Sequence, residues 1–366
     1  MTLFIVPQLP VKNRYQEHWM SWWSEELHNL GVDYYIIRPD NWLEYIDKTK
    51  YFTPNDCEYF APTEPAVKWD AEIAKKLFEM MQFIGGTRDY LLFLDFDYTG
   101  LFQGLIPLIK RYNPDLRIGA YVHAGSWAPR DYFEPVRYSK LWMELGTTIA
   151  LDHLFFPSES AYMTAVDSMC ELHYFKTKCI RELNFKSHVV GSLWKPYDEI
   201  MGARKKKEEL IRKEKWLKES NVVMINGRYG SLDHKILSQI IENLRGEVTF
   251  VATDKWVAKK YNIKHMNYFE ALSIAKVMLQ PKVYDTFGLA VVEALYTLTV
   301  PVLPRIWVYE ELYGKHVVRQ NNYVDVVEYA VSNYDKIYEN LNGDYLLLKK
   351  EKLNAPRRIV EILGFI

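Results

Sequence analysis

The sequence predicts an α/β protein built from two Rossmann-like domains that face each other across a cleft. Three observations support this fold class. The chain has 366 residues, more than a single core comfortably holds. Short apolar runs typical of buried strands alternate with helical patterns, as in βα units with parallel sheets. This alternation occurs twice, and the stretch "VVGSLWKPYDEI" from residue 189 separates the two sets.

The first set predicts an N-terminal Rossmann-like domain over residues 1–190. Short runs rich in Leu, Ile, Val, Phe and Tyr predict strands, and longer amphipathic stretches predict helices. The expected strands are 3–7, 32–39, 90–96, 117–123 and 153–158, and the expected helices are 15–31, 71–85 and 100–112. Gly31 ends the first of these helices, as glycine commonly does.

The second set predicts a C-terminal Rossmann-like domain over residues 191–345, and a C-terminal helix over 346–366 is expected to pack back towards the first domain. The expected strands are 221–227, 247–253, 277–281 and 300–304, and the expected helices are 204–220, 234–246, 268–276 and the stretch after Gly288. The basic run at 204–207 is followed by interleaved Glu residues, which favours a solvated helix over a nucleic-acid patch.

Composition bounds the functional class. The formal net charge is −1, so no global attraction to nucleic acid or to an acidic membrane is expected, although a local basic face remains open. No apolar run is long enough for a transmembrane segment, and the first residues do not read as a signal peptide. The three cysteines lack metal-type spacing and read as reduced thiols, so we expect a cytoplasmic protein. They are Cys57, Cys170 and Cys179.

The stretch "LLFLDFDYTGLF" places Asp95 and Asp97 directly after a predicted strand. This pattern matches the nucleophile loop of haloacid-dehalogenase-type phosphatases, in which Asp95 would be phosphorylated and Asp97 would act as acid and base. That loop normally opens its domain, whereas two strands precede it here. We therefore favour a loop that faces the cleft. The alternatives are the phosphatase, the Asp-x-Asp metal pattern of nucleotide-sugar enzymes with a single Rossmann-like domain, and a structural turn.

The stretch "VVMINGRYGSLDHK" carries Gly227, Arg228 and Lys235 between a strand and a helix. Glycine lets the backbone approach a ligand, a helix N-terminus favours anions, and the two cations can pair with phosphate oxygens. These residues predict a diphosphate-binding loop, although the same Gly-Arg pair could simply turn the chain.

The stretch "KVYDTFGLAVVEAL" places Asp285 before Gly288, and Glu293 on the helix that follows. Gly288 would leave the helix N-terminus open to a ligand. Glu293 is charged among apolar neighbours, so we expect it to be buried and to have partners, either protein donors or ligand hydroxyls. Hydroxyls of a ribose or a sugar would satisfy both acids.

This order of elements resembles the second domain of retaining glycosyltransferases of the GT-B type. The stretch "DTFGLAVVEAL…PVL" is most similar to their family 4, whose hallmark is two acids separated by seven residues. The resemblance is specific over roughly residues 221–304. The sequence departs from the family in having Asp285 where Glu is usual, two extra residues between Arg228 and Lys235, and the bulkier "YTLTV" before the final Pro-Val.

The resemblance implies that the domain over residues 1–190 binds the acceptor and that the domain over residues 191–345 binds the nucleotide sugar. It also implies roles for the matching residues. Glu293 would hold the donor ribose, Asp285 would contact the donor sugar in a catalytic role, and Arg228 and Lys235 would bind the diphosphate. The remaining donor-binding residues would be Gly227, Phe287, Gly288 and Leu289.

The stretch "YVHAGSWAPRDYF" places His123 at the end of a first-domain strand. In the family a histidine at the equivalent place often faces the donor sugar, so His123 is the second expected catalytic residue. Asp97, Trp127 and Arg130 would line the acceptor side.

The expected activity is transfer of a sugar from a UDP- or GDP-linked donor to an acceptor hydroxyl, without a metal or another cofactor. The acceptor stays open among a glycan, a lipid-linked sugar and a modified, hydroxymethylated base in DNA. A non-catalytic protein that binds nucleotide sugars is a further alternative.

Overall fold

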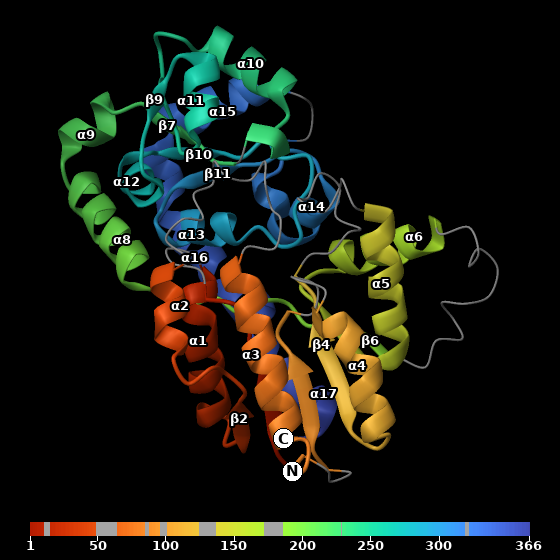
Figure 1. Ribbon diagram of the computed structural model, residues 1–366. Coiled ribbons are helices and arrows are strands. Elements are labelled where there is room, and N and C mark those ends of the chain that lie inside the picture. The colour runs from red at the N-terminus through yellow and green to blue at the C-terminus, as the bar shows by residue number, and fades with distance from the viewer. Residues whose placement is uncertain are drawn as a thin grey trace. The chain divides into compact units, whose positions relative to one another are not determined.

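The computed structural model describes residues 1–10, 15–48, 64–84, 88–95, 101–123, 137–171, 186–227, 229–318 and 322–366. The chain divides into two compact units, Met1–Trp194 together with Lys352–Ile366, and Lys195–Glu351. Each is described by itself, and Figure 1 labels their elements. None of the described helices combines the length and the apolar character that crossing a lipid bilayer requires.

In the described part of the first unit, six parallel strands form one sheet in the order β2-β1-β3-β4-β5-β6. Strands β1 and β3 are buried on both faces, which is why they read as unbroken apolar runs rather than alternating ones. The strands are β1 Leu3–Val6, β2 Tyr34–Ile36, β3 Tyr90–Phe93, β4 Arg117–Tyr121, β5 His153–Phe156 and β6 Lys186–Val189.

The helices of this unit follow from the strand order. From β1 to β2 the chain moves along the sheet in one direction, and all later steps move in the other, so right-handed crossovers place α1 opposite α3 to α6. Helix α17 packs on α1, while α3, α4 and α5 pack side by side (Figure 1). The bounds are α1 Tyr15–Asn29, α2 Trp42–Lys48, α3 Glu64–Met80, α4 Leu101–Tyr112, α5 Arg137–Ala150, α6 Glu159–Glu171 and α17 Ala355–Leu363.

The second unit repeats the pattern with five parallel strands in the order β11-β10-β7-β8-β9 among its described residues. The chain leaves β7 in both directions along this sheet, so the order reverses between β7 and β10. In open α/β sheets, ligands bind beyond the carboxyl ends of the strands at such a reversal. The strands are β7 Val222–Ile225, β8 Thr249–Ala252, β9 Lys264–His265, β10 Val277–Leu279 and β11 Val300–Val302.

Helices cover this second sheet, and a few short turns connect them. The helices are α8 Asp198–Ile211, α9 Glu214–Glu219, α10 His234–Asn243, α11 Lys255–Tyr261, α12 Tyr268–Ile274, α13 Leu289–Tyr296, α14 Trp307–Tyr313, α15 Tyr323–Ser332 and α16 Tyr334–Lys352, with 3-10 turns at Tyr229–Ser231 and Gly314–His316. The C-terminal segment is therefore two helices, α16 and α17, that meet near Lys352 rather than one helix over 346–366.

The interpretation of 204–220 as one solvated helix was wrong in two respects. The segment is split into α8 and α9, and Lys207 is fully buried. The Lys207 ammonium donates hydrogen bonds to the carbonyl of Ala275 and, at 3.2 Å, to Oγ1 of Thr299. Burial lowers its pKa well below the usual value, and nearby Lys276 lowers it further. Lys207 therefore joins α8 to the residues that directly precede β10 and β11, which a charge pattern alone could not reveal.

Candidate functional site

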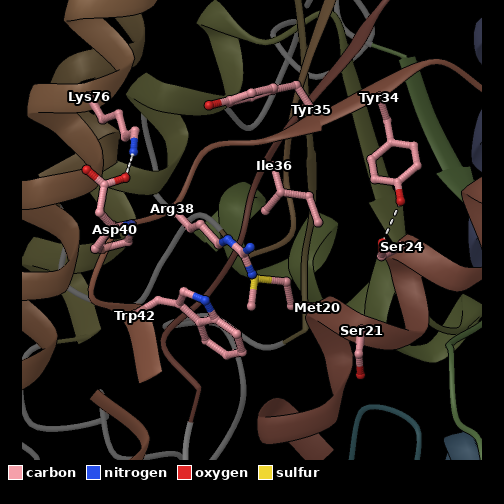
Figure 2. Close-up of a pocket in the computed structure, with 11 residues that line it drawn as sticks. Met20, Ser21, Ser24, Tyr34, Tyr35, Ile36, Arg38, Asp40, Trp42 and Lys76 are labelled. Atoms are coloured by element: carbon pink, nitrogen blue, oxygen red, sulfur yellow. Dashed lines mark hydrogen bonds and ion pairs between the residues drawn. The ribbon is translucent and has the colours of Figure 1, made fainter. Parts of the chain in front are cut away.

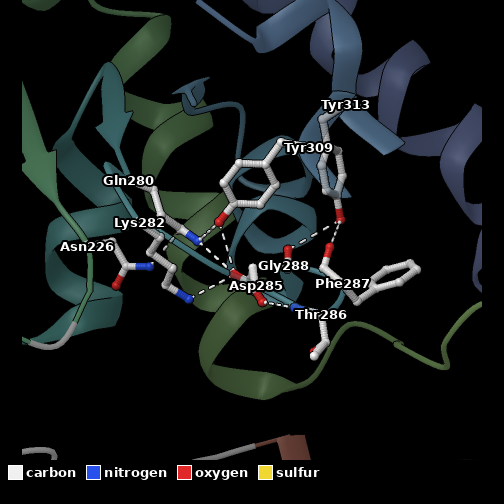
Figure 3. A network of polar contacts seen from close by, with 9 residues as sticks. All are labelled: Asn226, Gln280, Lys282, Asp285, Thr286, Phe287, Gly288, Tyr309 and Tyr313. Atoms are coloured by element: carbon white, nitrogen blue, oxygen red, sulfur yellow. Dashed lines mark hydrogen bonds and ion pairs between the residues drawn. The ribbon is translucent and has the colours of Figure 1, made fainter. Parts of the chain in front are cut away.

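The loops after β7 and β10 lie at the reversal point of the second sheet and are joined by backbone hydrogen bonds. The amide of Asp233 donates to the carbonyl of Pro281 at 2.7 Å, and the amide of Val283 donates to Ser231 at 3.2 Å. Side chains also cross between the strand ends, since the Asn226 amide donates to Gln280 Oε1 at 3.0 Å. The two stretches singled out in the sequence therefore form one rim (Figure 3).

Asp285 is the centre of a polar network on this rim. Its Oδ2 atom accepts hydrogen bonds from Lys282 Nζ at 2.9 Å, from the Tyr309 hydroxyl at 2.9 Å and from Gln280 Nε2 at 3.3 Å. Its Oδ1 atom accepts one, from the amide of Thr286 at 2.9 Å. Figure 3 shows these donors converging from the β10 loop and from α14. The carboxylate is therefore held in one orientation, with Oδ2 crowded and Oδ1 less so.

The network keeps Asp285 ionised. Burial raises the pKa of its carboxyl, but the charge and hydrogen bond of Lys282, together with the bonds from Tyr309 and Thr286, outweigh burial and leave the pKa below its usual value. Burial raises the pKa of Tyr309 far above that of a free phenol, and Asp285 raises it further. Tyr309 therefore stays protonated and acts as a permanent donor to the carboxylate.

Gly288 is the N-cap residue of α13 and has φ of +81°, which other residues rarely adopt. A Cβ atom here would lie 3.0 Å from Cε1 of Tyr309. The preceding Phe287 is buried, and its carbonyl accepts from the Tyr313 hydroxyl at 2.9 Å. Leu289 is half-buried as the first residue of the helix. The turn before α13 is thus held by two tyrosines of α14, Tyr309 and Tyr313.

Glu293 lies on α13 and is buried, with 7% of its surface exposed. Its Oε1 accepts from the Tyr197 hydroxyl at 2.8 Å, and its Oε2 accepts from the Tyr268 hydroxyl at 2.5 Å. Burial raises the pKa of Tyr268 well above its usual value, and Glu293 adds to the shift. Of the two kinds of partner expected for Glu293, the structure supplies protein donors. Burial of this acid alone therefore does not require a ligand.

The predicted diphosphate loop is described in part. Gly227 directly follows Asn226 with φ of +141°, and a Cβ atom there would clash with the Leu232 side chain. Lys235 is exposed in the first turn of α10. The N-terminal amides of that helix are capped by Asp233, which accepts from Lys235 at 3.0 Å and from Ile236 at 3.2 Å. The α10 N-terminus thus already carries an acid, contrary to the expectation that it favours a ligand anion. Arg228 lies outside the described residues.

His123 follows β4 at the carboxyl end of the first sheet. Its ring centre lies 4.0 Å from that of Trp19 and 4.9 Å from that of Tyr121. Burial lowers its pKa to about 3, so the imidazole is neutral at physiological pH. A neutral ring can exchange hydrogen bonds with a ligand but carries no positive charge for catalysis.

The other first-unit predictions concern the ends of β3 and β4. Asp95 follows β3, the strand next to β1, where the strand order of this sheet reverses. The reversal makes this end of the sheet a second place where ligands are expected. Asp97, Trp127 and Arg130 lie outside the described residues.

Sequence reasoning missed five residues that hold the two acids. Lys282 and Gln280 lie within or next to the stretch that carries the motif, so their nearness in the sequence is a signal that could have suggested them. The three tyrosines come from distant elements, and no local pattern marks them. They are Tyr197, Tyr268 and Tyr309. Among the described residues, no group of three or more His, Cys, Asp or Glu side chains is placed to hold a metal ion.

No protein-family model matches the chain, and no curated protein sequence matches it either. Solved structures do match over nearly their whole length. Sucrose-phosphate synthase from Thermosynechococcus elongatus has a TM-score of 0.63 at 11% identity, with 100% of this chain and 98% of that chain covered.

Two further solved structures are similar to this chain to about the same degree. Anabaena HepE in complex with UDP-glucose has a TM-score of 0.62 at 10% identity, with 100% of both chains covered. The UDP-forming α,α-trehalose-phosphate synthase from Burkholderia vietnamiensis has a TM-score of 0.60 at 11% identity, with 100% of this chain and 98% of that chain covered. At these identities the likeness establishes the architecture, and the chain has the GT-B fold of two Rossmann-like domains, as the sequence predicted.

Proposed function

We propose that the protein is a retaining glycosyltransferase that moves a hexose from a UDP- or GDP-linked donor to an acceptor hydroxyl, with no metal ion required. The observation that carries this proposal is the placement of two ionisable acids around Gly288. Asp285, the glycine turn and Glu293 lie on the loop and helix that follow β10, at the reversal point of the second GT-B sheet. That is where this architecture binds ligands.

Asp285 is suited to hold a sugar hydroxyl. Three donors engage Oδ2 and one engages Oδ1, so Oδ1 has the greater remaining capacity to accept a hydrogen bond. The donors fix the carboxylate before a ligand arrives, which lowers the cost of ordering it on binding. We assign Oδ1 of Asp285 to a hydroxyl of the donor sugar and Glu293 to the ribose.

The leaving diphosphate would be stabilised by positive groups that the sequence places in or directly after the loops that follow β7 and β10. We assign this role to Arg228, the amides at the start of α13 and Lys235, and add Lys282 because it is a partly buried cation beside Asp285. Preorganised cations and helix N-termini stabilise developing charge strongly where water is excluded.

In the proposed step, the acceptor hydroxyl attacks the anomeric carbon from the face that the diphosphate leaves. A bond forms between the acceptor oxygen and the anomeric carbon as the bond from that carbon to the phosphate oxygen breaks. The acceptor proton passes to the departing phosphate. Neutral His123 would donate a hydrogen bond to the sugar, and Asp97, Trp127 and Arg130 would bind the acceptor.

The donor is the testable part of this proposal. UDP-glucose is the first choice because HepE has been solved with it, and a GDP-linked hexose is the second. The correct donor should raise the melting temperature of the protein, and Arg228→Ala should remove most of that rise. Lys215→Ala on α9, an exposed lysine away from the rim, is the matched control. Turnover of the bound donor, in the presence and absence of EDTA, is then followed with glycan, lipid-linked and modified-DNA acceptors.

Each outcome has a distinct meaning. Stabilisation by no nucleotide sugar and by no nucleoside diphosphate would overturn the proposal. Binding without turnover on any acceptor class would favour a non-catalytic binding protein. Activity that EDTA abolishes and magnesium restores would move the chemistry to Asp95 and Asp97, and phosphate release would identify the phosphatase alternative.

A further inference from the structure

A pocket lies in the first unit, beside the edge strand β2, and no residue from the ends of β3 and β4 lines it. Its volume is about 590 Å³, within the ~300–1,000 Å³ typical of small-ligand sites. Helix α1, strand β2, the loop after it and helices α2 and α3 all contribute to its walls (Figure 2). The side chains that matter for its chemistry are Ser21, Ser24, Tyr34, Arg38, Trp42 and Lys76.

Arg38 is the most informative residue of this pocket. Its guanidinium carbon lies over the Trp42 ring, 4.8 Å from the ring centre. The residue is half-buried, and no carboxylate of the described residues forms an ion pair with it. The aromatic ring therefore holds the guanidinium in place while its N–H groups stay available.

The other charges of the pocket largely cancel. Lys76 on α3 forms an ion pair with Asp40, and its hydrogen bond and charge lower the pKa of that exposed carboxyl. Asp40 therefore stays ionised and engages Lys76. The positive charge of Arg38 remains unbalanced at the pocket wall, which favours an anionic ligand.

The remaining wall suits a body that carries hydroxyl groups. The Ser24 and Tyr34 hydroxyls lie 2.5 Å apart and share a hydrogen bond, and Ser21 donates to the carbonyl of His18 at 2.7 Å. Each of these oxygens keeps capacity to accept a hydrogen bond. Trp42 and Tyr35 offer aromatic surface of the kind on which apolar faces of rings pack.

We propose that this pocket binds a small oxyanion, a phosphate monoester or a carboxylate, carried on a sugar-sized body. The guanidinium of Arg38 would bind two oxygens of the anion side by side, which its planar fork allows and a lysine does not. This site is distinct from the rim around Asp285, and it does not depend on the proposed transfer reaction.

The test is isothermal titration of the whole chain with four probes: glucose 6-phosphate, glucuronate, inorganic phosphate and neutral glucose. We expect at least one of the two sugar anions to bind saturably and more tightly than glucose, and the two arms distinguish phosphate from carboxylate. Arg38→Gln should weaken that binding at least about tenfold, since it removes a charge-assisted pair. Arg38→Lys should recover only part of the affinity.

The control is Lys75→Gln, which changes an exposed lysine on α3 one position from the pocket residue Lys76 and should leave affinity unchanged. Thermal unfolding of each variant confirms that it folds. The proposal is overturned if neither sugar anion binds saturably, if glucose binds as tightly, or if Arg38→Gln leaves the affinity of the bound anion unaltered.

Discussion

Tyr309→Phe removes a single oxygen from the network around Asp285 and leaves the ring in place. Tyr309 is fully buried, so the phenylalanine ring fills the same space and no large cavity forms. The lost hydroxyl donates to Asp285 Oδ2 at 2.9 Å and accepts from Gln280 Nε2 at 2.6 Å. The effect of the change is therefore that of two hydrogen bonds, one of them to a carboxylate.

The expected cost is about 1.5–3 kcal/mol of unfolding free energy at neutral pH, the usual worth of a hydrogen bond to a charged group. Lys282, Gln280 and the Thr286 amide still donate hydrogen bonds to the Asp285 carboxylate, so the loss of unfolding free energy should not exceed this range. The loss should depend on pH. The pKa of Asp285 is lowered in the folded protein, so its ionisation stabilises the fold above the unfolded pKa of about 3.9, and this is lost as pH falls through the folded pKa. The variant should therefore differ most from the parent near neutrality.

Urea unfolding of the full chain at pH 7 and at a pH well below the unfolded pKa of about 3.9 measures this difference. Tyr313→Phe is the matched control, because Tyr313 is also buried on α14 but donates to the neutral carbonyls of Phe287 and Gly288. It should cost about 0.5–1.5 kcal/mol with little change between the two pH values. A double-mutant cycle with Asp285→Asn should show a coupling of at least ~0.5 kcal/mol. Equal, pH-independent losses for the two tyrosines would refute the reasoning.

Three further outcomes are expected. Gly288→Ala should destabilise the fold by about 1–3 kcal/mol in urea, because φ is +81° and the new methyl meets Tyr309; no loss would contradict the left-handed turn. Lys207→Met should remove part of the rise in stability with pH. The pKa of Lys207 is depressed in the folded protein, so the unfolded chain binds more protons and stability rises with pH up to the usual lysine pKa of about 10.4. Unfolding measured between pH 7 and 10 detects whether the variant flattens that slope. On the proposed function, Glu293→Gln should weaken UDP and full donor alike, by about tenfold, while Asp285→Asn should spare UDP and reduce turnover; equal losses in calorimetry would remove this division of roles.

The sequence predicted the parts of this structure that local pattern controls. Continuous apolar runs predicted the central strands of both sheets, because a strand that is buried on both faces has apolar residues at every position rather than at every second one. The turn before the helix was predicted from Gly288. The buried position of Glu293 was predicted because it is the one charged residue on an otherwise apolar helix. The short elements β6, β9 and α11 were not predicted: β6 and β9 carry few apolar residues, and α11 has only seven residues, too few to show a helical period.

The partners of the acids could not be predicted, because they come from elements far along the chain. Tyr309 lies 24 residues after Asp285, and Tyr197 lies 96 residues before Glu293, so only the folded sheet brings them together. The burial of Lys207 could not be predicted for a different, local reason. Its neighbours Arg204, Lys205 and Lys206 belong to the same basic run, and the sequence does not say which member of the run turns inward.

The contact between Gly191 and Lys352 shows that the second unit is an insertion. The amide of Ser192 donates to the Lys352 carbonyl at 2.8 Å, and the amide of Ala355 donates back to Ser192 at 3.1 Å. Gly191 has φ of +81°, and a Cβ atom there would clash with that same carbonyl oxygen, so only glycine allows the approach. The two places where the chain leaves and re-enters the first unit are thereby tied together. Residues 195–351 could then be replaced by a short linker without separating the ends that the first unit needs.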